Sequence, residues 1–151
     1  YSHLECGNLD YKSACCKPQI PTPKNPNICY TGFMDLGWKV VYYISANGEN
    51  PVSDFLDTLE QSSQSKILRI LHNIQEYGLD SVIPHIKKLT GTPFWEIRIL
   101  GRNSIRVIYV VPAKFQVLVL HGFKKKTQKT PLKELETASR RYNEYVLRKK
   151  K

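Results

Sequence analysis

The chain has 151 residues, enough for one domain with a buried core but short for two. No stretch has the length and apolarity of a membrane-spanning helix, which excludes a helical membrane protein as a function class. The net charge is +10 and it is unevenly placed, since residues 87–151 hold seventeen Lys and Arg against four Asp and Glu, whereas residues 34–86 hold three against seven. Such a basic half is typical of nucleic-acid-binding proteins. The alternative is a solvated surface with a basic tail.

Residues 1–33 differ in composition from the rest of the chain. They contain all four cysteines and four of the nine prolines, and no CxxC spacing that would indicate a zinc site. The only methionine, Met34, directly precedes the first patterned segment. We therefore interpret residues 1–33 as an extension outside the fold, either translated upstream sequence or a cloning remnant. The predicted domain is 34–148, followed by a basic tail at 149–151. Because this domain lacks cysteine, the cytoplasm is the expected compartment.

The first half of the domain predicts one strand and two helices. Residues 38–45, "WKVVYYIS", are rich in β-branched and aromatic side chains and predict a strand. Asn50 is a favourable N-cap and Pro51 a favourable first residue for a helix. "QSSQS", 61–65, is expected to be a turn before a second helix, which Gly78 ends. The apolar stripes of the two helices are Val52, Phe55, Leu56 and Leu59, and Ile67, Ile70, Leu71 and Ile74.

The second half predicts three strands and a closing helix. Residues 94–100, 104–111 and 116–123 are short and β-rich, and the turn residues between them favour an antiparallel meander. Thr130 and Pro131 then start the last helix. The predicted order is β-α-α-β-β-β-α, an α+β fold in which helices pack on one face of an antiparallel sheet and leave the other partly open.

The strand register predicts a pair of arginines. A three-residue loop at 101–103 places Arg98 directly opposite Arg106, about 5 Å apart at Cβ. Like charges so placed are destabilising, and an anion between them would explain their presence. On this reasoning, removing Arg106 should leave folding intact or slightly improved. The alternative is that Glu96 bridges both guanidinium groups in an inert ion-pair network.

The end of the third meander strand is expected to bring further basic groups toward the same open face of the sheet. His121 and a lysine-rich loop follow the apolar run of that strand, and the converging charges suit a phosphodiester. Crowding of cations lowers lysine pKa values, which favours proton transfer near neutral pH. No Asp/Glu/His pattern indicates a metal site, and no cofactor is predicted. The residues expected to contact RNA are Lys87, Lys88, Arg102, Lys124, Lys125 and Lys129.

Three segments, "FWEIRIL", "SIRVIYVV" and "VLVLHGFKKKTQKTP", resemble the RelE/ParE toxin superfamily, in particular its phage-derived HigB-like branch. The resemblance covers about residues 36–147 and is most specific at 118–131. It implies a RelE-like fold and a cytoplasmic toxin held inactive by a small helix-turn-helix, HigA-like antitoxin. It also implies ribosome-dependent cleavage of mRNA without a metal, by attack of a 2′-hydroxyl on the adjacent phosphate.

The resemblance also implies roles for single residues. Arg106 matches the arginine that contacts the scissile phosphate, and Arg98 matches a basic residue of the same pocket. His121, Lys125 and Lys126 match basic residues of the strand exit. Phe123 stands where some relatives have a tyrosine or histidine, so the acid and the base stay open, with Glu96 a candidate base. The predicted catalytic set is Arg98, Arg106, His121 and Lys126.

Two other functions remain compatible with the sequence. ParE-like relatives use this scaffold to inhibit gyrase without catalysis, and a basic module can bind RNA or DNA without cutting it. The arginine pair and the strand-exit lysines favour RNA cleavage, because gyrase inhibition needs no phosphate-sized pocket.

Overall fold

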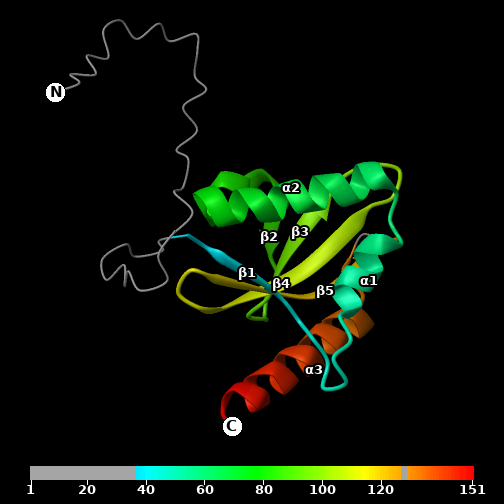
Figure 1. Ribbon diagram of the computed structural model, residues 1–151. Coiled ribbons are helices and arrows are strands. Elements are labelled where there is room, and N and C mark those ends of the chain that lie inside the picture. Colours follow the sequence, from blue (N-terminus) through cyan, green and yellow to red (C-terminus); the bar gives the residue numbers. More distant parts are fainter. Residues whose placement is uncertain (1–36, 127–128) are drawn as a thin grey trace, which may run out of the picture. The chain divides into compact units, whose positions relative to one another are not determined.

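The computed structural model describes residues 37–126 and 129–151, all of which belong to one unit spanning Asp35–Lys151 (Figure 1). The predicted extension at 1–33 and the domain start at Met34 lie outside the described residues. So do Thr127 and Gln128 of the lysine-rich loop.

A five-stranded mixed sheet forms the centre of the fold, with strand order β1-β5-β4-β3-β2. β1 runs parallel to β5, and the other neighbouring strands are antiparallel. The α+β class and the three-stranded meander are thus confirmed. The strand at 38–45 is confirmed as β1, but its parallel pairing with β5 and the short β2 were not predicted. The elements are β1 Lys39–Tyr42, α1 Pro51–Asp57, α2 Gln61–Tyr77, the 3₁₀ helix η1 Leu79–His85, β2 Ile86–Lys88, β3 Trp95–Ile99, β4 Ile105–Ala113, β5 Gln116–Lys124 and α3 Leu132–Lys149.

Local sequence signals set most helix ends. The Oδ1 atom of Asn50 accepts a hydrogen bond from the Ser53 N–H at 3.0 Å, so Asn50 caps α1 as predicted. Gly78, with φ +83°, ends α2 as predicted, since a residue with Cβ is strained there. The turn expected at 61–65 is wrong, because α2 begins at Gln61. That segment holds no glycine or proline to stop a helix, and Gln and Ser differ little from other residues in helix propensity.

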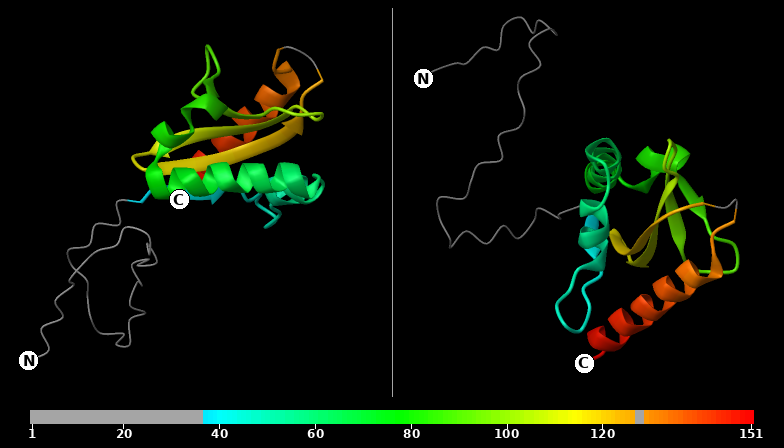
Figure 2. Two further views of the ribbon diagram at one scale, coloured as in Figure 1. Left: turned by 90° about the horizontal axis from the view of Figure 1, so that it is seen from above. Right: turned by 90° about the vertical axis from the view of Figure 1, so that its right-hand side faces the viewer.

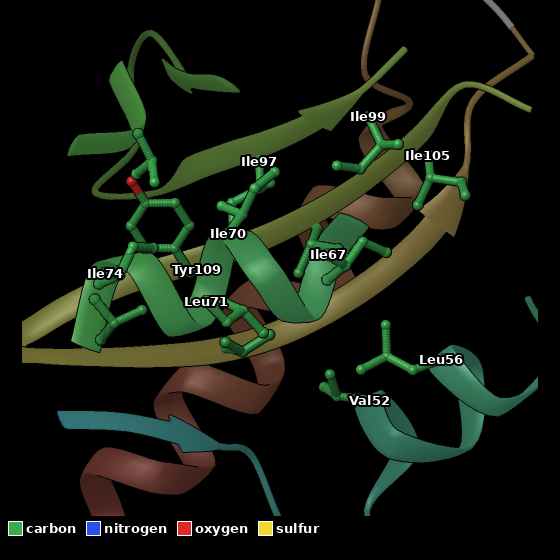
Figure 3. Packing of buried hydrophobic residues seen from close by; sticks show 14 of the residues in the cluster. Val52, Leu56, Ile67, Ile70, Leu71, Ile74, Ile97, Ile99, Ile105 and Tyr109 are labelled. Carbon is green, nitrogen blue, oxygen red and sulfur yellow. The ribbon is translucent and has the colours of Figure 1, made fainter. Parts of the chain in front are cut away.

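Helices cover both faces of the sheet, which corrects the expectation of helices on one face only (Figure 2). Helices α1 and α2 and η1 pack on one face, where the core is built around residues such as Ile74, Ile97 and Tyr109 (Figure 3). Helix α3 covers the other face through Ala138. The physical reason is that β4 and β5 alternate apolar side chains onto both faces, so neither face can be left in water. The buried α3-side residues of these strands are Ile108, Val110, Leu118, Leu120 and Phe123.

Gly122 makes room for α1 on the sheet. A Cβ at this position would lie 2.3 Å from Cδ1 of Phe55, whereas a Cβ at Gly101 meets nothing within 4 Å. Gly122→Ala should therefore lower the free energy of unfolding by about 1–3 kcal/mol through overpacking. Urea unfolding measures the change, with Gly101→Ala as the matched control. Equal stability of the two variants would show that Phe55 does not need the space.

Candidate functional site

The predicted arginine pair is present. Arg98 and Arg106 are direct partners in the β3–β4 register. The turn between the two strands has three residues, which lie between Leu100 and Ser104, and this turn length sets the register. Arg106 shares the α3-side face with Ile108 of its own strand, and Glu96 lies opposite Ile108. The two arginines and Glu96 therefore lie on one face of the sheet.

Glu96 is a buried carboxylate that contacts both arginines. The residue is 2% exposed, and its Oε1 atom lies 3.7 Å from Nε of Arg106 and 3.9 Å from Nε of Arg98. Thr130 donates a hydrogen bond to Oε2 at 3.0 Å. The bridging of both guanidinium groups, an alternative left open by the sequence, is thus observed. Within the described residues, however, neither arginine Nε has a hydrogen-bond acceptor.

Cations outnumber the carboxylate in this cluster. Lys87 lies opposite Glu96 in the β2–β3 register, and Lys125 interacts electrostatically with Glu96, both arginines and Lys87. Four basic side chains therefore surround one carboxylate. We call this group the Glu96 cluster, defined as Lys87, Glu96, Arg98, Arg106 and Lys125.

The members of the cluster differ in how far they reach the surface. Arg106 is 4% exposed and donates from Nη1 to the Ile105 carbonyl at 3.0 Å. Burial is the main reason that the pKa of Arg106 is below its ordinary value, with Glu96 acting in the opposite direction. The Arg98 side chain is 41% exposed, and Lys87 is exposed. A ligand from solvent would therefore meet Arg98, Lys87 and Lys125 before Arg106.

The surroundings of Lys125 shift its ionisation. Its pKa is below the ordinary lysine value, first because of burial and then because Arg106, Arg98 and Lys87 repel its charge, while Glu96 partly compensates. The backbone N–H of Lys125 is fixed by the Ser104 carbonyl at 2.6 Å. Sequence reasoning assigned the catalytic lysine to Lys126, which is exposed. Strand alternation counted onward from Phe123, the partner of Arg106, places Lys125 on the face of the arginine pair.

The other residues predicted to contact RNA are spread over the surface. Lys88 lies over the Trp95 ring, with Nζ 4.9 Å from the ring centroid, and Trp95 packs against the α1–α2-side core. Lys124 is the register partner of Ile105, which belongs to that same core, so Lys124 lies on that face too. Arg102 and Lys129 are exposed. Of the predicted set, the structure places Lys87 and Lys125 next to the arginine pair.

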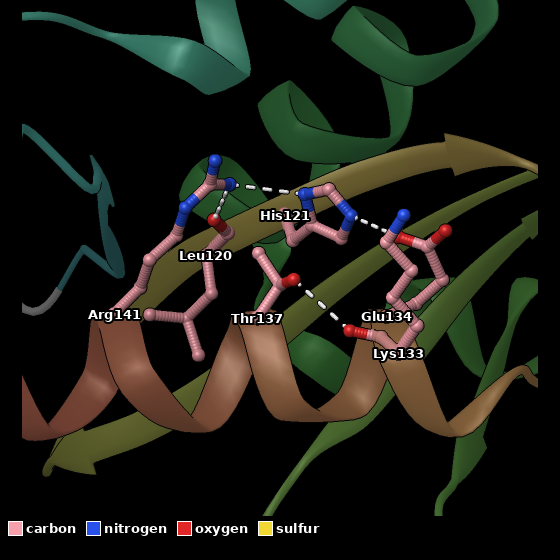
Figure 4. Close-up of polar contacts among 6 residues, drawn as sticks. All are labelled: Leu120, His121, Lys133, Glu134, Thr137 and Arg141. Carbon is pink, nitrogen blue, oxygen red and sulfur yellow. Dashed lines mark hydrogen bonds and ion pairs between the residues drawn. The ribbon is translucent and has the colours of Figure 1, made fainter.

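His121 is held by α3 through both ring nitrogens (Figure 4). Arg141 donates from Nη1 to Nδ1 at 3.0 Å and also to the Leu120 carbonyl at 2.8 Å. The proton of the neutral ring is therefore assigned to Nε2, which donates to Oε2 of Glu134. Sequence analysis missed Glu134 and Arg141, because it did not predict that α3 covers this face. His121 acts here as a contact between the sheet and α3.

This arrangement predicts a pH-dependent stability. Burial, reinforced by Arg141, outweighs Glu134 and lowers the His121 pKa below its ordinary value. Because the unfolded chain then binds more protons than the native one, stability is lost as pH falls from about 6.5 towards the native pKa. Urea unfolding from pH 7.5 to 5 should show a steeper loss for the wild type than for His121→Gln. Parallel curves would show that His121 does not titrate as proposed.

Two searches of the described residues give negative findings. Residues 37–126 and 129–151 contain no group of three or more His, Cys, Asp or Glu placed to hold a metal ion. None of the helices described has the length and apolarity needed to cross a membrane.

Comparisons with known proteins assign the chain to a family. Residues 54–143 match the model of the family described as "Phage derived protein Gp49-like (DUF891)". The match begins in α1, includes strands β2 to β5 and ends in α3, so it contains the whole Glu96 cluster. A search of curated proteins gives no significant match. Since the matched region spans more than half of the chain, this protein belongs to the family of phage-derived Gp49-like proteins.

Proposed function

We propose that this protein is the toxin of a toxin–antitoxin system and that it cleaves mRNA on the ribosome. The observation that carries the proposal is the Glu96 cluster, in which four basic side chains surround a single carboxylate. A cluster with this excess of positive charge suits an anionic ligand, and guanidinium and ammonium groups are the usual partners of phosphate. Membership of a phage-derived family supports the toxin assignment.

The proposed chemistry uses the exposed members of the cluster to hold the phosphate. Arg98 binds the non-bridging oxygens of the scissile phosphate, to which its planar guanidinium can donate two parallel hydrogen bonds. Its positive charge also stabilises the negative charge that grows on these oxygens in the transition state. The 2′-hydroxyl attacks this phosphorus, which forms a 2′,3′-cyclic phosphate and breaks the bond to the 5′ oxygen. Lys125 gives its proton to the leaving 5′ oxygen, a role that its lowered pKa favours.

Two buried residues support this site from beneath. Glu96 is 2% exposed and bonded to Thr130, so it is out of reach of a substrate hydroxyl, and the 2′-hydroxyl proton passes to water instead. Glu96 orients Arg98, and Arg106 offsets the buried negative charge. Arg106 therefore acts in this proposal through Glu96 and Arg98 rather than by direct contact with the phosphate.

The proposed partners are the translating ribosome with its mRNA and an antitoxin of the helix-turn-helix type. Residues 34–86, which are net acidic, give the antitoxin a surface distinct from the basic half.

The test is to map 5′ ends of cellular mRNA after brief induction of the protein. The proposal expects new ends inside translated codons. Intact mRNA together with DNA damage would instead indicate a gyrase inhibitor, and intact mRNA without damage a module that only binds nucleic acid. The variant Lys125→Met, induced to the same level, is the control that ties new ends to this site.

A further inference from the structure

A second basic site lies next to the Glu96 cluster, at the exposed edge of β3. It is a pocket of about 320 Å³ between α2, η1 and the end of β3. This volume is within the range of pockets that bind small ligands. The lining residues are Lys66, Arg69 and Ile70 of α2, His85 of η1, and Arg98, Ile99 and Leu100.

The charge of this pocket is of one sign. Lys66 and Arg69 are three residues apart on α2, a spacing that places both on the same side of the helix, and both are exposed. His85 and Arg98 face them across the pocket, and none of the seven lining residues is acidic. Neither Lys66 nor Arg69 forms an ion pair with any residue of the described part of the chain. Gathering like charges in this way costs stability unless an anion binds between them.

Arg98 connects the pocket to the Glu96 cluster. Its Nε atom lies 3.9 Å from the Glu96 carboxylate, and its side chain also lines the pocket. This is possible because β2 begins at Ile86, opposite Ile97, so that no strand flanks Arg98 and Ile99 on that side. A chain of basic groups therefore runs from Lys125 and Lys87 over the strand edge to α2.

The pocket also has an apolar wall. Ile70 and Ile99 form its floor, and Leu100 is 72% exposed beside it. Aliphatic side chains next to several cations suit a nucleotide, because the cations can hold its phosphate while the base packs against the apolar wall. An inorganic anion alone would leave this wall unused.

We propose that this pocket binds a nucleotide of single-stranded RNA that adjoins the nucleotide held at the Glu96 cluster. The inference rests on the proposed function for its ligand and extends it, because it assigns Lys66, Arg69 and His85 to RNA binding. These residues would hold the strand in register on the protein while Arg98 and Lys125 act on the scissile phosphate. The pocket should therefore contribute to affinity and not to the rate of the bond-breaking step.

The test compares two double variants of equal charge. Lys66→Gln/Arg69→Gln neutralises two cations of the pocket, and the control Lys39→Gln/Lys114→Gln neutralises two exposed lysines near the β4–β5 turn, at the opposite end of the sheet. All four side chains are exposed, so both proteins should fold, and circular dichroism checks this. The probe is a fluorescein-labelled, single-stranded 2′-O-methyl RNA, whose binding is followed by fluorescence anisotropy at several salt concentrations.

The pocket variant should bind the probe about 10- to 100-fold more weakly than the control, the loss expected for two solvent-exposed hydrogen bonds worth about 0.7–1.4 kcal/mol each. The slope of log K against log salt should fall by about 1.4, or about 0.7 for each phosphate contact removed. Equal affinities of the two variants, or a wild type that does not bind the probe, would overturn the inference. Since a 2′-O-methyl strand cannot be cleaved by 2′-hydroxyl attack, this result is independent of whether the protein cuts mRNA.

Discussion

Replacing Lys125 by methionine is expected to lower the single-turnover rate of mRNA cleavage by ~10²–10⁴, the usual contribution of a general acid. The side chain lies among Glu96, Arg98 and Arg106, and its pKa is lowered by burial and by the neighbouring cations, so it releases a proton more readily than an ordinary lysine. Methionine keeps the length and the apolar stem but can donate no proton. The measurement is rapid-quench cleavage on ribosomes programmed with a defined message.

Two controls separate proton donation from charge. Lys126→Met removes an exposed lysine one position further on, and we expect it to cost less than tenfold. The wild-type rate should fall as pH rises through the lowered pKa of Lys125, because the acid form is lost. Lys125→Arg keeps the positive charge, but arginine does not release its proton at ordinary pH. Its cleavage should therefore be slow, and the cleavage rate should not fall further as pH rises. If Lys126→Met were the more damaging substitution, Lys126 and not Lys125 would be the acid.

Arg106→Met is expected to lower the free energy of unfolding by about 3–5 kcal/mol, because it leaves the Glu96 carboxylate buried without its nearest cation. This reverses the expectation from the sequence that removing Arg106 is harmless or slightly stabilising. That reasoning counted only the repulsion from Arg98. The structure adds a 4% exposed guanidinium whose Nε atom is 3.7 Å from a 2% exposed carboxylate.

Arg98→Met is the matched control, since Arg98 is the direct register partner of Arg106 and carries the same charge. Its side chain is 41% exposed, so its loss should cost about 0–1 kcal/mol. Urea unfolding of both variants gives the comparison. Losses of similar size would contradict the view that Arg106 contributes more than Arg98 to compensating the buried carboxylate. The cleavage rate per folded molecule should show the opposite order, so that Arg98→Met cleaves more slowly than Arg106→Met.

The sequence predicted those parts of the fold that depend on local signals. The cap at Asn50, the stop at Gly78 and the strands of the meander follow from backbone preferences and from alternation, and all are confirmed. The parallel pairing of β1 with β5 could not be predicted in this way, because it joins segments from opposite ends of the fold. The position of α3 was missed although β4 and β5 carry apolar residues on both faces, which is the pattern of a sheet covered on two sides.

For the site, register reasoning was more informative than residue type. The turn length at 101–103 predicted that Arg98 faces Arg106, and this is confirmed. The same reasoning was not extended to the end of β5, where strand alternation places Lys124 and Lys125 on opposite faces of the sheet. The contacts of His121 with Glu134 and Arg141 depend on the position of α3 and so on tertiary structure. The sequence therefore grouped His121 with the neighbouring lysines and did not predict these two contacts.

The central proposal is that the Glu96 cluster cleaves RNA by attack of a 2′-hydroxyl on the adjacent phosphate. Its most direct test uses ribosomes carrying two forms of one message, one all-ribose and one with a single 2′-deoxy nucleotide on the 5′ side of the bond that is cut. The account predicts that the all-ribose message is cut to a 2′,3′-cyclic phosphate and a 5′-hydroxyl end, and that the 2′-deoxy message stays intact at that bond. Equal cutting of the two messages, or no cutting of either, would contradict it.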